Sequence, residues 1–204
     1  MTDLAGVYHD LVRAQADGLF EEVLLGGPLG AQPVKRHPLG FTVVQLKLDG
    51  DGLRLHLWKG GAISQPGYEI HDHAFSLESF IVDGAIRHRT FEALEDPRGD
   101  YAVYSVHYEP DQSVMTKTSA RARLKKTSDD VYVAGQSYSV PAWRPHDALL
   151  DGTASATTLV LTRDLDGAPV TYGPADGPQT LKAARAPVSD QALADLGLAR
   201  ARAF

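Results

Sequence analysis

Three histidines and one glutamate stand out in the sequence, because their types and spacing suit a metal ion. His71 and His73 are separated by one residue, Glu78 follows His73 after four residues, and His146 lies far along the chain. In an extended strand successive side chains alternate between two faces, so His71 and His73 point the same way. Imidazole binds Fe, Zn, Cu and Ni, and a carboxylate shifts the preference toward harder ions. The pattern predicts a metal site with three histidine ligands and one glutamate ligand.

The residues around these ligands occur at distances that resemble the two motifs of the cupin superfamily. The segments are Gly67-x3-His71-x-His73-x4-Glu78-x5-Gly84 and Gly135-x5-Pro141-x4-His146. The resemblance covers residues 40 to 163, and it implies a cupin-type barrel in which His71, His73, Glu78 and His146 hold the metal. The departures from the motifs concern loop positions. Both glycine spacings of the first segment are short, and Trp143 and Leu150 stand where the second motif has glycine and asparagine.

The stretch from Ile70 to Glu78 also resembles the cysteine dioxygenases, which are relatives of the cupins. Glu78 falls where the mammalian enzymes have a cysteine. Their substrate-binding arginine and catalytic tyrosine have no match near Val43 and Thr162. This second resemblance therefore implies a shared scaffold and not thiol dioxygenation.

The composition narrows the class of protein. The chain has 204 residues, enough for one large or two small domains, and 43% of them are hydrophobic, which supplies a sizeable core. A net charge of -6 without a long basic run argues against nucleic acid as a partner. The absence of cysteine excludes disulfides, thiolate ligands and a thiol nucleophile. Without a signal-peptide pattern or an apolar stretch near the ~20 residues of a membrane span, a cytoplasmic protein without a membrane partner is expected.

Short alternating strands make up most of the predicted elements. From Phe41 onward, apolar and polar residues alternate in runs that are separated by Gly, Asp and Pro. The predicted strands cover 44–48, 53–58, 68–73, 77–82, 85–91, 101–108, 120–126, 131–134, 138–140 and 157–162. This pattern is typical of an antiparallel sandwich or barrel. The predicted fold class is mainly β, a cupin-type antiparallel β-barrel or jelly roll.

Helical segments are expected at both ends of this β-core. Apolar residues recur at helical spacing from Leu4 to Val23, and the Gly26-Gly27-Pro28 sequence ends the pattern. The apolar stripe of this helix would cover the outside of a sheet or form a contact in a homodimer. We expect a single domain over 1–204, with a helical extension at 1–38, a β-barrel core at 40–163, and an irregular strap with a short helix after Ser189 at 164–204.

The register of one hairpin decides whether the pocket is charged. If Asp83-Gly84 forms a two-residue turn, Arg87 and Arg89 face the metal side. Inward-facing arginines would indicate an anionic substrate. If a one-residue bulge is present, Ile86 and His88 lie inside and both arginines face water. The second arrangement is the more common one for charged side chains, because a buried charge must be paired.

Four other residues are candidates for the pocket lining. Phe80 shares the strand face of Glu78, as either a pocket or a core residue. Tyr104 and His107 lie on opposite faces of one predicted strand, so at most one of them faces the pocket. Trp143 precedes His146 and is expected at the barrel mouth, either as an aromatic wall or as part of the core.

The ligand types and the resemblance together predict a metal-dependent enzyme with a small-molecule substrate. Fe(II)-dependent oxygenation, with O₂ as co-substrate, is the first expectation. A redox-neutral isomerase, lyase or hydrolase that uses the ion as a Lewis acid is the second, and a ligand-binding cupin without turnover is the third. Iron is the expected divalent metal, and Zn, Ni, Mn and Cu stay open, because ligand types alone do not choose among them.

Overall fold

Two antiparallel sheets that face each other form the body of the protein. The computed structural model describes residues 3–59 and 65–188. In the first sheet the strand order is β1 (Val34–Arg36), β2 (Phe41–Leu48), β3 (Asp51–Lys59), β10 (Ser155–Asp164), β4 (Phe75–Asp83) and β8 (Ser137–Val140). In the second sheet it is β11 (Val170–Pro174), β6 (Tyr101–Glu109), β7 (Gln112–Val133), β5 (Ala85–Glu95) and β9 (His146–Leu150), with β12 (Thr180–Ala184) paired to β7. This two-sheet jelly roll confirms the predicted fold class.

The chain passes from the first sheet to the second at Gly84. β4 ends at Asp83 and β5 begins at Ala85, yet β4 pairs with β8 and β10 while β5 pairs with β7 and β9. The expected β4–β5 hairpin is therefore wrong. A backbone φ of +77° at Gly84 makes the sharp change of direction, and a β-carbon there would lie 2.3 Å from the carbonyl oxygen of Ser155. Only glycine fits such a position without displacing backbone.

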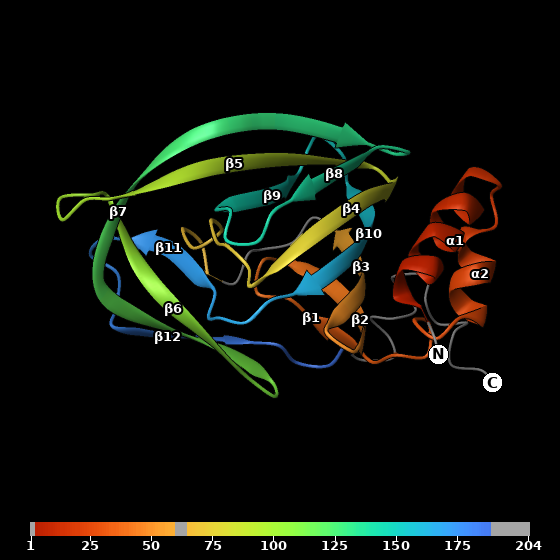
Figure 1. Ribbon diagram of the computed structural model, residues 1–204, viewed down its shortest axis with the longest axis horizontal. Helices are drawn as coiled ribbons and strands as arrows, with labels where there is room; N and C mark the ends of the chain where they lie inside the picture. Colours follow the sequence, from red (N-terminus) through yellow and green to blue (C-terminus); the bar gives the residue numbers. More distant parts are fainter. Residues whose placement is uncertain (1–2, 60–64, 189–204) are drawn as a thin grey trace.

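Two helices, rather than the single predicted one, precede the sheets (Figure 1). The α1 helix (Leu4–Ala16) begins at Asp3, whose carboxylate accepts a hydrogen bond from the backbone N–H of Ala5. Gly18, with φ of +72°, separates it from α2 (Phe20–Gly26). The apolar stripe of α1 packs on the outer face of the first sheet, in a core cluster that contains Leu4, Tyr8, Leu11, Leu53, Leu55, Phe80 and Leu159.

The predicted boundaries of the β-core were too narrow. β1 lies inside the predicted helical extension, and β11 and β12 lie inside the predicted strap. The expected C-terminal helix lies outside the described residues. Within the part of the chain that the structure describes, no helix is long and apolar enough to span a membrane.

Candidate metal centre

Between the two sheets His71, His73 and His146 come together. One ring nitrogen of each lies within 4.8 Å of the corresponding nitrogens of the other two. Backbone pairing joins these distant parts of the sequence, because His71 and His146 exchange two N–H···O bonds of 3.0 and 2.9 Å. His71 also forms a bridge with Thr171 of β11, so the histidine segment is held on both sides.

Backbone carbonyls fix the orientation of two of the three imidazoles. The Nδ1 of His71 lies 2.7 Å from the carbonyl oxygen of Glu69, and the Nδ1 of His146 lies 2.9 Å from that of Arg144. A carbonyl oxygen can only accept, so both Nδ1 atoms carry the proton and both Nε2 atoms offer a lone pair. This is the arrangement in which protein histidines bind metals, with the second ring nitrogen donating to a fixed acceptor.

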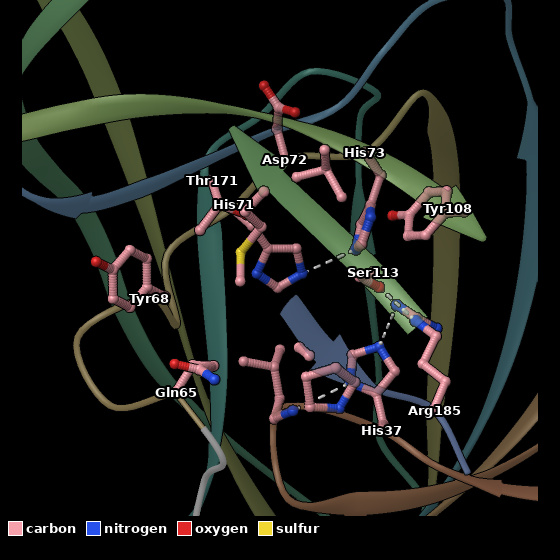
Figure 2. A pocket seen from close by; sticks show the side chains of 15 residues that line it. His37, Gln65, Tyr68, His71, Asp72, His73, Tyr108, Ser113, Thr171 and Arg185 are labelled. Atoms are coloured by element: carbon pink, nitrogen blue, oxygen red, sulfur yellow. Dashed lines mark hydrogen bonds between the residues drawn. The ribbon is translucent and has the colours of Figure 1, made fainter. Parts of the chain in front are cut away.

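His73 completes the cluster from the next inward position of the same segment. Its Nε2 lies 3.1 Å from the Nε2 of His71, a contact that Figure 2 shows as a dashed line. Its Nδ1 is buried and has no hydrogen-bond partner among the described residues. The ring of Phe75 stacks on the imidazole at 4.2 Å between centroids. The imidazole is thus held by packing, with its Nε2 turned to the cluster.

The three histidines are neutral at neutral pH. Burial lowers the pKa of His71, and it lowers those of His73 and His146 well below the usual range for imidazole. The neighbouring histidines lower the pKa values of His73 and His146 further, because two adjacent cations repel each other. Neutral imidazole is the form that binds a metal ion, so the cluster can hold a divalent ion without first losing protons.

Glu78 does not belong to this cluster, and its prediction as a ligand was wrong. The hydroxyl of Tyr8 in α1 donates a 3.3 Å hydrogen bond to a Glu78 carboxylate oxygen, so Glu78 faces the helix and not the interior. In β4, Leu77 and Ser79 line the interior cavity, and the side chain between them must point to the other face. The same alternation places Phe80 in the core under α1, so it is not a pocket residue.

Arg87 and Arg89 lie outside, contrary to the first of the two predicted registers. Both form ion pairs on the outer side of the second sheet: Arg87 with Asp129 and Asp151 at 3.1 and 3.0 Å, and Arg89 with Asp147. Ile86 and His88 are the inward-facing residues, and both are buried. The cause is the passage between sheets at Gly84, and not a bulged hairpin.

Of the other candidate pocket residues, only His107 borders a cleft. His107 is exposed and lies at the edge of an open cleft of about 620 Å³. Tyr104 is completely buried, packs against Tyr68 and donates a 3.1 Å hydrogen bond to the carbonyl oxygen of Pro178, so it is a core residue. Trp143 is 41% exposed and covers Gly167, a position beside the cleft rather than in its lining.

Sequence reasoning missed the polar residues that line the interior. Arg54 and His56 of β3, together with His37 and Arg185, border the same cavity as the three histidines. The alternation along β3 carried a signal for this. Leu53 and Leu55 pack under α1, so Arg54 and His56, which alternate with them, must face the interior.

No protein-family model matches the chain, and no curated protein sequence is similar to it. The solved structures to which the chain is similar include three different enzymes. The protein is similar to a variant of oxalate decarboxylase from Bacillus subtilis, with 13% identity over 67% of this chain and 28% of that chain and a TM-score of 0.39. For hydroxypropylphosphonic acid epoxidase from S. wedmorenis the identity is 14%, the coverage is 67% and 57%, and the TM-score is 0.40. For a DMSP lyase structure the identity is 18% over 80% of this chain and 75% of that chain, and the TM-score is 0.41.

The chain spans little more than a quarter of the decarboxylase and just over half of the epoxidase. Three neutral imidazoles converge between two antiparallel sheets, held by backbone pairing and carbonyl acceptors. The described chain is a two-sheet jelly roll with an inward-facing cluster of three histidines.

Proposed function

We propose that this protein is a metal-dependent enzyme that binds Fe(II) through His71, His73 and His146 and oxygenates a small organic molecule with O₂. The observation that supports this most is the donor set itself. Three neutral nitrogen donors converge at one point, and no carboxylate among the described residues joins them. An ion that prefers six ligands would keep three positions free on such a set, enough for a substrate and O₂.

When it is bound, Fe(II) would supply the electrons that activate O₂. The chain's own residues would supply position and environment. The carbonyls of Glu69 and Arg144 orient two imidazoles, and the aromatic rings of Phe41, Trp58 and Phe75 give the interior an apolar border. Apolar walls around a site of this kind reduce side reactions of reactive species with water.

The test is oxygen consumption by protein loaded with Fe(II) under nitrogen and then mixed with a panel of small organic acids. We expect O₂ uptake that depends on one substrate class, and that is lost in His73→Ala. Glu78→Gln serves as the matched control, since its side chain faces Tyr8 outside the cluster. Equal O₂ consumption by wild type and His73→Ala would contradict the proposal.

A redox-neutral reaction is the second candidate, and the same donor set favours it. Three histidines with an open fourth position are also a ligand set of catalytic zinc, which activates bound water at neutral pH. Protein loaded with Zn(II) would then turn over a substrate without O₂. In the oxygenase proposal Zn(II) occupies the same ligands and inhibits.

A further inference from the structure

Two arginines, Arg54 and Arg185, border the interior beside the histidine cluster without a carboxylate partner. Both line the open cleft of about 620 Å³ that also reaches His73. Neither forms an ion pair within the part of the chain that the structure describes, whereas Arg87, Arg89 and Arg123 all do. Enclosing a guanidinium without a counter-ion costs free energy, so a pair of them in one cavity requires an explanation.

Arg54 has the less satisfied guanidinium of the two. Its Nε is buried without a hydrogen-bond partner among the described residues. Its guanidinium carbon lies 4.5 Å from the centre of the Phe75 ring. Burial lowers the pKa of Arg54 to about 10, which leaves it positively charged at neutral pH. A charged guanidinium without an ion-pair partner among the described residues thus lines the cleft.

Arg185 is fixed in place by neutral groups only. Its Nε donates a 2.6 Å hydrogen bond to the hydroxyl of Ser113, and its Nη2 lies 3.3 Å from the Nε2 of His37. The guanidinium lies over the ring of Tyr108, with 5.0 Å from its central carbon to the ring centroid. Figure 2 shows these partners around one end of the guanidinium, at the side of the pocket opposite Tyr68. Such partners orient the group and leave its charge uncompensated.

The two carboxylates that line the cleft contact neither arginine. One oxygen of Asp164 accepts a 2.8 Å hydrogen bond from Lys47, and the other is buried without a hydrogen-bond partner among the described residues. The charge of Asp164 acts to raise the pKa of Arg54, but no ion pair joins the two side chains. Glu109 accepts a hydrogen bond from Gln112, and Lys35 pairs with Asp111 at 3.5 Å. Within the described chain, Arg54 and Arg185 are thus cleft-lining guanidinium groups that no carboxylate contacts.

We propose that Arg54 and Arg185 form an oxyanion subsite that binds the negatively charged oxygen group, a carboxylate or a phosphate, of a small organic acid. Guanidinium forks bind such groups with paired, charge-assisted hydrogen bonds. The ring of Phe75 touches both the guanidinium of Arg54 and the imidazole of His73. A molecule anchored at the arginines therefore extends past a single side chain to the histidine cluster. This inference rests on the proposed function and specifies its substrate class.

The test measures anion binding to metal-free protein, by calorimetry and by thermal shift. The probes are propionate, its neutral isostere propionamide, and inorganic phosphate. We expect propionate or phosphate to bind and to raise the Tm, and propionamide to do neither. Arg54→Met is expected to weaken the binding at least tenfold. It should also raise the Tm of the free protein, because methionine removes an unpaired enclosed charge.

Arg87→Met is the matched control, since it removes the same charge from the outer face, where Arg87 pairs with Asp129 and Asp151. Its anion affinity should equal that of wild type. Arg54→Lys keeps the charge but loses the fork, and intermediate binding is expected from it. Equal anion binding by wild type and both Arg54 variants, or no binding of either anion to wild type, overturns the subsite.

Metal binding is measured on the same Arg54→Met protein with Co(II). Retained metal together with lost anion binding supports both the subsite and the separate histidine site. If wild type binds Co(II) but neither anion, the subsite fails and the proposed function stands. If wild type binds the anion but no metal, the proposed function fails and the subsite stands as an anion site.

Discussion

At the scale of single residues, neighbours in β5 have opposite environments, and this gives a sharp pair of mutations. Ile86 is fully buried in a cluster with Phe41, Trp58 and Ile81, while Arg87 lies outside. Ile86→Asp should unfold the protein at room temperature, because it buries a carboxylate without a partner at a cost of several kcal/mol. The measurement is the far-UV circular dichroism signal and its thermal transition.

Arg87→Leu is the companion change. Its ion pairs lie on the surface, where such pairs contribute little, so the Tm should stay close to that of wild type. If the Ile86→Asp protein is stable and the Arg87→Leu protein is unstable, Ile86 faces outward and Arg87 faces the interior, contrary to the structure.

The metal ligands show how far residue spacing alone can lead. The two histidines of the His-x-His pair and the distant His146 were predicted from the sequence, and the structure brings them together. Glu78 was assigned because it is a carboxylate close to the His-x-His pair and because the motif resemblance implies it, although its five-residue offset from His73 places it on the other face of a continuous strand. Simple alternation, followed from His71 to Ile81, predicts the observed faces. Arg185 could not be found this way, because its place depends on a chain segment after β12 that carries no pattern.

At the scale of elements, the passage between the sheets depends on one glycine. Gly84→Ala should strongly destabilise the protein, since the left-handed backbone costs about 1–2 kcal/mol for alanine and the new β-carbon would also meet the backbone of Ser155 and Ala156. Gly135 has φ of +86°, and a β-carbon added there would have nothing within 4 Å of it. Gly135→Ala should therefore be destabilised only by the cost of the left-handed backbone conformation.

Urea unfolding of the two glycine variants separates the two costs. The Gly84→Ala protein should have a clearly lower midpoint than the Gly135→Ala protein. Equal midpoints would mean that the approach of β4 to β10 at this passage is looser than the structure has it.

The α1 helix is the second element whose contribution can be measured. Leu11 is buried against the first sheet, and Leu19, in the break between the two helices, is 49% exposed. Leu11→Ala should lower the free energy of unfolding by about 2–5 kcal/mol, and Leu19→Ala by less than about 0.5 kcal/mol. Equal losses in chemical denaturation would show that α1 does not cover the sheet as described.

Two of the strands that the sequence did not predict, β11 and β12, share a physical cause. β11 and β12 are short strands in a segment rich in Gly, Pro and Ala, and each is held by pairing with a long neighbour, β6 or β7. Tertiary pairing, and not local propensity, makes them strands. Strand β3 was predicted within a few residues, because Leu53, Leu55 and Leu57 give it one apolar face.

At the scale of the whole molecule, buried neutral histidines make the stability depend on pH. Burial lowers the pKa of His56 to about 3 and that of His88 to about 4, against about 6.5 in the unfolded chain. Because the folded pKa is the lower one, the unfolded protein takes up more protons below pH 6.5, and stability is lost as the pH falls toward the folded values. For each such histidine, the free energy of unfolding should fall by about 2 kcal/mol between pH 6.5 and pH 5.

Urea titrations of metal-free protein at several pH values measure this loss. His56→Leu should flatten the dependence by the share of one histidine. An unfolding free energy that is constant from pH 7 to pH 5 would mean that these imidazoles are open to water.

Three histidines, and not the glutamate of the motif, form the proposed metal site. A Co(II) titration followed by visible absorption on wild type, His73→Ala and Glu78→Ala tests this ligand set. We expect one tightly bound ion in wild type, the same affinity and spectrum in Glu78→Ala, and a loss of at least tenfold in affinity in His73→Ala. Unchanged binding in His73→Ala, or a loss in Glu78→Ala as large as that expected for the histidine, would contradict it.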